Sequence, residues 1–227
     1  MQLKRAQRLC GTLLLSLIGL AAARPPVHAG GMESWNTMEA VLAHGRQWRL
    51  ECGAFVRVNQ RFSEAYDDGV RCRVAYVVTP RVTVLGGFVQ RWFDKNGKGH
   101  VAEERPQMGI AARLTDTRRF RAEATSEMEF FNYPSGKSSY IRYRSKIDLE
   151  KPARRIAPVL SEELFFTRAD GLVRTRTIAG IRHRMEGGSR FELGYQFQND
   201  LTNGAWVPKH AIRTAMYFGD IFHRRGD

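Results

Sequence analysis

Hydrophobic and charged side chains alternate at every second position along most of this chain. The segment 139–149 shows the alternation most clearly, since Ile141 and Tyr143 share one parity and Arg142 and Arg144 share the other. Successive side chains of a β-strand point to opposite faces, so this segment predicts a strand with one apolar and one charged face. The same pattern predicts ten strands and a weaker eleventh, over residues 46–58, 70–79, 81–93, 105–115, 118–131, 137–149, 155–166, 171–184, 189–199, 206–219 and, for the weaker one, 33–43.

The lengths of the strands and of their connections favour a barrel that crosses a membrane. Most segments have 10 to 14 residues, which suits a tilted membrane strand of about 9–11 residues with some overhang. Short connections (79–81, 115–117, 150–154, 186–188) alternate with mostly longer ones rich in Gly, Asn and Asp (59–69, 94–104, 132–136, 200–205). Short turns on one side and longer loops on the other are typical of outer-membrane barrels.

We therefore predict an all-β fold, an antiparallel up-and-down transmembrane β-barrel of ten to twelve strands, forming one domain over residues 30–227. Single-chain bacterial barrels have even strand numbers. An eleventh strand would start the chain on the wrong side of the membrane, so residues 33–43 are interpreted either as a periplasmic lead-in or as a sign that one further strand is missed.

Residues 1–29 have the pattern of a secretory signal peptide. Lys4, Arg5 and Arg8 precede a short apolar run over 11–23, and Ala29 ends a plausible cleavage site. The run is shorter than the roughly 20 residues that a spanning helix needs, which disfavours an uncleaved anchor. Cleavage near Ala29 predicts export, and the barrel pattern predicts the bacterial outer membrane.

The charged parity is dominated by arginine, with Glu and Asp interspersed and few lysines. The planar arginine fork suits fixed, partly desolvated pairing with carboxylates, and a narrow barrel is filled largely by side chains. We therefore place the charged parity inside and the apolar parity against lipid. The predicted lumen-lining residues are Arg57, Arg73, Arg91, Arg113, Arg121, Glu123, Glu127, Arg142, Arg144, Glu163, Arg174, Arg176, Arg182, Glu192 and Arg213.

The alternative from another class inverts the two faces. A periplasmic lipocalin-like barrel that binds a lipid or another small ligand would line its interior with the same apolar residues. Aromatic residues near the strand ends, such as Trp48, Trp92 and Phe218, instead favour an interfacial girdle around a membrane barrel.

Two local features disturb or extend the pattern. Pro158 would remove a ladder hydrogen bond and Glu162 falls on the apolar parity, so a β-bulge near 158–162 is predicted to restore the phase. Cys52 and Cys72 lie on the apolar parity of consecutive predicted strands and could face each other across a hairpin. An exported protein permits a disulfide between them, and two unbonded small apolar residues are the alternative.

The chain resembles a known family, the bacterial proteins grouped as domain of unknown function 2490, which are assigned to outer-membrane β-barrels. The resemblance spans most of 33–219 and is carried by short stretches at 119–131, 163–166, 174–182 and 193–198, together with the Arg142/Arg144 strand. It implies a fold and a location, and it implies neither catalytic residues nor a ligand. Many barrels end on an aromatic residue that the assembly machinery reads, whereas here 223–227 follow Phe222.

The sequence offers no constellation for catalysis. Lipid-modifying barrel enzymes need a Ser–His pair, but the histidines outside the leader are scattered and none has an obvious serine partner: His44, His100, His183, His210 and His223. We expect no enzyme, no metal site and no cofactor. The formal net charge of +13 comes from arginines at alternate strand positions, not from one basic cluster, which disfavours nucleic-acid binding.

The sequence thus predicts an outer-membrane barrel with an Arg/Glu-lined lumen, either a narrow, porin-like, anion-preferring pore or a structural barrel. The expected partners are outer-membrane lipid, the outer-membrane assembly machinery and small anionic solutes.

Overall fold

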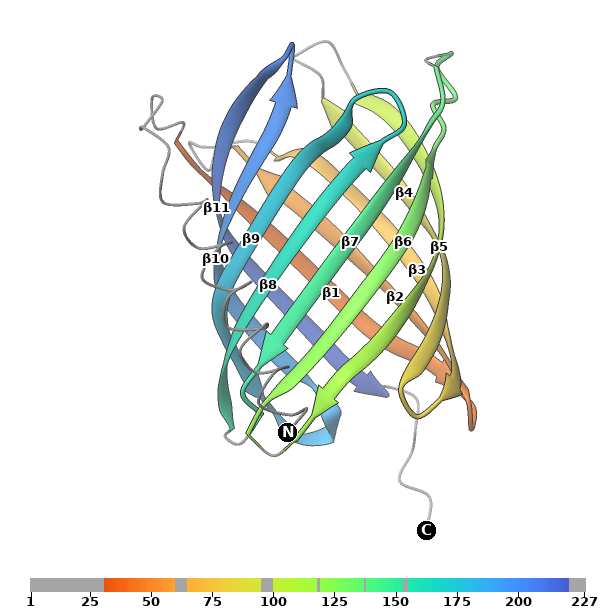
Figure 1. The fold of residues 1–227 in the computed structure, drawn as a ribbon, viewed down its shortest axis with the longest axis vertical. Coiled ribbons are helices and arrows are strands. Elements are labelled where there is room, and N and C mark those ends of the chain that lie inside the picture. Colours follow the sequence, from red (N-terminus) through yellow and green to blue (C-terminus); the bar gives the residue numbers. More distant parts are fainter. Residues whose placement is uncertain are drawn as a thin grey trace, which may run out of the picture.

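Eleven strands wrap into a single closed barrel in the computed structural model of the chain (Figure 1). The structure describes residues 31–59, 65–94, 100–117, 119–136, 138–152 and 155–220. The predicted signal peptide and residues 221–227 lie outside these ranges. The strands are β1 (Met32–His44), β2 (Trp48–Val58), β3 (Ala65–Thr79), β4 (Val82–Asp94), β5 (His100–Asp116), β6 (Arg121–Phe131), β7 (Tyr140–Glu150), β8 (Ile156–Thr167), β9 (Gly171–Arg184), β10 (Arg190–Thr202) and β11 (Ala205–Asp220).

Every strand pairs with its neighbours in the chain, and the barrel closes where β1 meets β11. The consecutive pairs are antiparallel, whereas β1 and β11 are parallel, with Met32 opposite His210 and Met38 opposite Met216. The parallel pair follows from the odd number of strands, because the first and last strands of an up-and-down barrel with an odd number of strands run in the same direction. The prediction of ten to twelve strands is confirmed, with a mixed sheet in place of a wholly antiparallel one.

The segment 33–43 is part of the wall, so its interpretation as a lead-in before the barrel is wrong. β1 pairs along nearly its whole length with β2 on one side and β11 on the other. Its inner parity carries Trp35 and Glu39, each 7% exposed, so β1 contributes side chains to the interior as the other strands do.

The connections alternate in length less regularly than the sequence indicated. We call the end of the barrel that carries connections 45–47, 80–81, 117–120, 151–155 and 185–189 the lower rim, and the opposite end, with 59–64, 95–99, 132–139, 168–170 and 203–204, the upper rim (Figure 1). The expected loop over 200–205 is instead a two-residue turn. Asn203 and Gly204 both have positive φ, at 52° and 76°, which matches the twist of a tight hairpin.

The charged parity faces inward and the apolar parity faces outward. In β7, Arg142 is 7% exposed, whereas the neighbouring Ile141 and Tyr143 are 40% and 46% exposed. The same holds around the barrel, where Met38, Ile110 and Leu114 are each more than half exposed. Apolar contacts inside the barrel are few, and one small cluster of Ala75, Leu85 and Ala111 lies near the lower rim.

The predicted bulge near 158–162 is absent, because β8 keeps its phase through that stretch and shifts register only between Phe165 and Phe166. Pro158 lies beside the end of β7, and its carbonyl accepts a hydrogen bond from the Lys151 amide at 3.3 Å. Since N–H and C=O of one residue point to the same side of an antiparallel strand, the missing N–H faces a position that β7 no longer occupies. Glu162 points outward and accepts a hydrogen bond from Thr177 Oγ1 at 2.6 Å.

Cys52 of β2 and Cys72 of β3 lie directly opposite each other and form a disulfide, with a Cα–Cα distance of 4.1 Å. This bond ties the second hairpin of the wall, β2 with β3, together on its outer face. It closes a short loop of the chain, with a sequence separation of 20 residues.

Replacing both cysteines, as Cys52→Ala/Cys72→Ala, should lower the free energy of unfolding by about 3 kcal/mol, the entropy that a loop of this size restricts in the unfolded chain. Urea unfolding of the refolded protein measures the change. Dithiothreitol should destabilise the wild type and leave the double variant unaffected; equal sensitivity of both proteins to the reductant would contradict the prediction.

Candidate functional site

A chain of paired charges follows the inner wall near the upper rim. Arg57 Nη1 lies 2.7 Å from Asp67 Oδ2, and Asp67 Oδ1 accepts from Arg91 Nε at 2.5 Å. Arg91 Nη1 also lies 3.4 Å from Glu103 Oε2, and Glu103 forms a second ion pair with Arg105. These residues come from four adjacent strands, β2 to β5, and every pair except Glu103 with Arg105, which share β5, joins two neighbouring strands of the wall.

The same chain of pairs extends across β6 and β7. Arg105 Nη1 lies 3.6 Å from Glu129, and Arg142 Nε donates to Glu129 at 2.7 Å. The Arg142 guanidinium lies between two aromatic rings, 4.5 Å from the centroid of Phe131 and 4.7 Å from that of Phe165. A desolvated cation over an aromatic face adds about 2 kcal/mol to such a contact.

Three contacts between arginines and aromatic rings complete a ring. Arg176 of β9 lies 5.1 Å from the rings of both Phe165 and Trp35, and Arg57 lies 3.8 Å from the ring of Trp35. We call this ring the arginine belt; it consists of Trp35, Arg57, Asp67, Arg91, Glu103, Arg105, Glu129, Phe131, Arg142, Phe165 and Arg176.

The belt carboxylates are among the most buried groups of the protein. Asp67, Glu103 and Glu129 are at most 2% exposed, and each accepts from at least one arginine. Tyr133, which follows β6, donates a further hydrogen bond to Glu103 at 3.0 Å, and burial together with that carboxylate raises the pKa of its phenol. A buried carboxylate left without its cation would cost several kcal/mol, so the belt holds its members in fixed positions.

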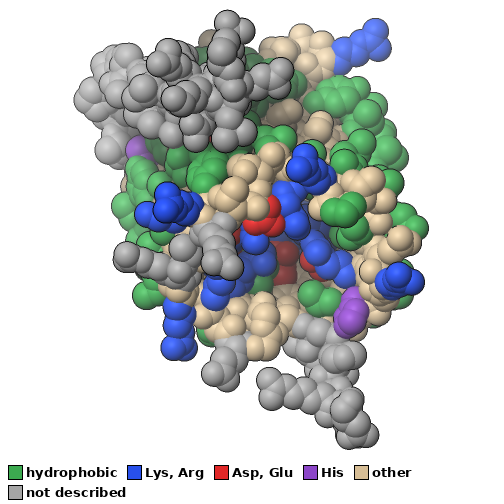
Figure 2. All heavy atoms as spheres, turned by 60° about the horizontal axis from the view of Figure 1, so that its bottom comes forward, with side chains coloured by type: hydrophobic (Ala, Val, Ile, Leu, Met, Phe, Trp, Pro, Cys, Tyr) green, Lys and Arg blue, Asp and Glu red, His purple; other side chains and the backbone are tan. Residues whose placement is uncertain are grey.

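Below the belt, a cavity of about 580 Å³ extends toward the lower rim. Its lining contains fourteen arginines and one lysine against nine carboxylates. Asp67, Glu103 and Asp200 do not belong to this lining but pair with its residues Arg91, Arg105 and Arg174, so the excess of positive charge in the lumen is smaller than this count. Figure 2, which brings the lower end forward, shows Lys and Arg side chains with Asp and Glu between them in a central hollow, with hydrophobic side chains on the flanks.

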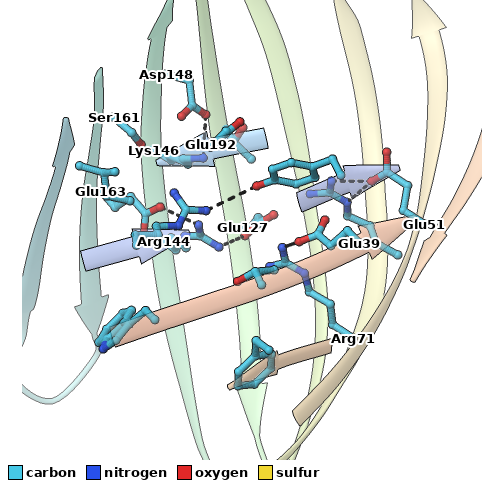
Figure 3. Close-up of a pocket in the computed structure, with 18 of the residues that line it drawn as sticks. Glu39, Glu51, Arg71, Glu127, Arg144, Lys146, Asp148, Ser161, Glu163 and Glu192 are labelled. Atoms are coloured by element: carbon cyan, nitrogen blue, oxygen red, sulfur yellow. Dashed lines mark hydrogen bonds and ion pairs between the residues drawn. The ribbon is translucent and has the colours of Figure 1, made fainter. Parts of the chain in front are cut away.

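Two networks of ion pairs lie in this cavity. In the middle, Arg144 donates to Glu127 and to Glu163, both at 2.9 Å, while Arg71 pairs with Glu39 on the other side of the lumen (Figure 3). Nearer the lower rim, the network contains other pairs: Arg73 with Glu51, Arg182 with Glu150 and Glu192, and Lys146 with Asp148.

Fourteen of the fifteen residues predicted for the lumen line this cavity. They are Arg57, Arg73, Arg91, Arg121, Glu123, Glu127, Arg142, Arg144, Glu163, Arg174, Arg176, Arg182, Glu192 and Arg213. Arg113 lies at the lower rim outside the cavity, where its half-exposed side chain pairs with Asp116 at 3.2 Å.

Sequence reasoning missed the aromatic members of the belt and several of its charges. Trp35, Phe131 and Phe165 stand on the charged parity of their strands, so parity alone could have placed them inside. Glu103 lies beyond the predicted end of its strand, and so does Asp67, because the two strands begin five residues earlier than expected.

The remaining candidates for chemistry are far apart. Outward-facing His210 contacts the Tyr195 hydroxyl and packs 5.3 Å from the Phe197 ring, while His183 lies in β9 opposite Phe191. Among the described residues, no group of three or more His, Cys, Asp or Glu side chains is arranged to hold a metal ion. No helix in the described part of the chain is long and apolar enough to cross a membrane.

Fold and interior together define the class: an eleven-stranded closed β-barrel with an apolar exterior and an ion-paired, arginine-rich interior. The chain belongs to the family DUF2490, described as a protein of unknown function, whose model matches residues 32–207. The match begins at the first residue of β1 and ends inside β11, so it covers nearly the whole wall. Neither the curated proteins nor the solved structures contain a match to this chain.

Removing one member of the belt should destabilise the barrel far more than removing a charge at the rim. Glu129→Gln leaves the Arg142 cation buried without a counter-ion, which should cost about 3–5 kcal/mol of unfolding free energy. Arg113→Ala, which removes a half-exposed charge, should cost less than about 1 kcal/mol. Urea titration in detergent, followed by tryptophan fluorescence, compares the two.

The double variant Glu129→Leu/Arg142→Met tests whether the cost comes from the unpaired charge. It should recover most of the stability that Glu129→Gln loses, because both buried charges are then absent. A double variant that is less stable than the single one would contradict this explanation.

Proposed function

We propose that this protein is an outer-membrane β-barrel whose narrow lumen admits small anions. One observation carries the proposal: the large apolar side chains face outward on a closed barrel, and the arginines face inward. A barrel in water would expose this apolar surface at great cost, whereas in a bilayer the same surface contacts lipid.

The position of the aromatic side chains supports a membrane around the barrel. Trp48 and Tyr76 are 42% and 46% exposed near the lower rim, and Trp92 is 37% exposed near the upper rim. Aromatic side chains at two levels on the outer face suit the two interfaces of a bilayer. Outer-membrane lipid and the machinery that inserts such barrels are therefore the partners that we propose.

The charge of the lining supports a preference for anions. Fifteen basic groups against nine acidic ones give the lumen a positive potential, and a ring of arginines at a constriction selects anions over cations. The arginine belt occupies the interior near the upper rim, so only small ions could pass it.

A periplasmic binding barrel would need an apolar interior for a lipid ligand. The lining here is mainly charged, so the interior offers such a ligand few apolar contacts. The outer-membrane proposal is for this reason preferred over the binding barrel.

Reconstitution in planar bilayers tests the passage of ions. Under a KCl gradient, the purified barrel should give small current steps. Their reversal potential should have the sign of the chloride equilibrium potential, not that of potassium. Arg49→Gln, which removes a cavity charge near the lower rim, should reduce the anion preference, whereas Arg113→Gln should not. Consistent silence of the wild type over many insertions would reject the pore.

Cell fractionation tests the location separately. The protein should appear in the outer-membrane fraction, resist extraction with salt and carbonate, and enter solution only with detergent. Recovery of the whole protein in the soluble periplasmic fraction would reject the membrane proposal and favour the binding barrel.

A further inference from the structure

We propose that the lumen contains a specific site for a soluble phosphate-class oxyanion, formed by Arg71, Arg144 and Arg213. This inference rests on the proposed entry of anions into the lumen and names the chemistry of the anion. The site lies in the middle of the cavity, between the arginine belt and the lower rim.

The three arginines converge from different parts of the wall. Arg71 belongs to β3, Arg144 to β7 and Arg213 to β11, and all three line the same cavity. In the close-up, Arg71 and Arg144 reach inward from opposite sides of the lumen (Figure 3). An anion bound in this cavity would stabilise guanidinium groups that reach into it from several sides.

The ion pairs of the cluster engage only two of the three arginines. Arg71 pairs with Glu39, and Arg144 pairs with Glu127 and Glu163, of which Glu163 also serves Arg176 at 2.9 Å. For Arg213, no carboxylate of the described residues lies within ion-pair distance. Its side chain contacts the Tyr217 hydroxyl at 3.5 Å, which is a weak interaction.

Further hydrogen-bonding groups in the same cavity lack protein partners. Arg144 Nε is buried with no acceptor among the described residues, although the other two nitrogens of its guanidinium are engaged. Ser161 lines the cavity from β8, is 7% exposed, and its Oγ also has no partner there. Buried polar groups of this kind are expected to bond to water or to a ligand.

The chemistry of these donors favours phosphate over chloride or a carboxylate. The Arg213 fork can bind two oxygens of a phosphate at once, while Arg144 Nε and Ser161 Oγ offer single donors, and donors from different strands suit oxygens arranged tetrahedrally. A halide offers no directed acceptors, and a planar carboxylate can satisfy only part of this set. The cavity opens toward the lower rim past Arg49, Arg121 and Arg190, which line its path.

Titration of the purified full chain in a phosphate-free detergent tests the site. Isothermal calorimetry with inorganic phosphate should show saturable binding to one site, and chloride at the same concentration should not compete. Arg213→Gln should weaken binding by about tenfold or more, because a charge-assisted interaction is lost. Arg213→Lys should lose less, and Arg113→Gln, which lies outside the cavity, should bind like the wild type.

Wild-type protein without saturable phosphate binding would overturn the proposal, and so would unchanged binding in folded Arg213→Gln. If that variant does not fold, Tyr217→Phe replaces it, with weaker binding expected and unchanged binding contradicting the site. Displacement by glycerol phosphate, but not by phosphatidic acid in the micelles, would show that the ligand is soluble; the reverse would assign the same chemistry to a lipid headgroup. The assay needs no membrane and no current, so its outcome is independent of whether the barrel conducts ions.

Discussion

The pairing of buried arginines with buried carboxylates is the interaction on which the rest of this structure depends. Asp67, Glu103 and Glu129 are almost completely enclosed, and a charge in that position is tolerated only with a counter-ion and directed hydrogen bonds. The arginine fork supplies both, and it can do so to two carboxylates at once, as Arg144 does for Glu127 and Glu163. The interior is therefore held by polar contacts between strands, where a soluble protein would have an apolar core.

This choice of interior determines the exterior. Because alternate side chains face opposite sides of a strand, every wall position that places an arginine inside leaves its neighbours to face outward. Those neighbours are mainly Val, Ile, Leu, Met and aromatic residues, which supports the proposal that lipid surrounds the barrel. The disulfide between Cys52 and Cys72 lies on the same outer face and adds a covalent link between β2 and β3.

The interior is organised in levels along the barrel. Near the upper rim, the arginine belt combines ion pairs with the rings of Trp35, Phe131 and Phe165, which fill the space and hold the guanidinium groups in place. Below it, the cavity has more cations than carboxylates, and Arg213 is the clearest excess charge. A narrow constriction beside a positively charged chamber is an arrangement that selects small anions, which links the two proposals made for this lumen.

The sequence by itself determined the two faces of each strand and the approximate strand positions, because a period of two is a local property of the chain. The closed barrel decided that the charged face lies inside. The sequence allowed Cys52 to face Cys72, and the register of β2 with β3 decided that they do. Other features depended on the pairing of the strands in the closed barrel: the parallel pairing of β1 with β11 and the phase of β8 around Pro158. Which arginine meets which carboxylate was also decided there, because strand tilt and stagger bring together residues such as Arg176 and Trp35 that no local pattern connects.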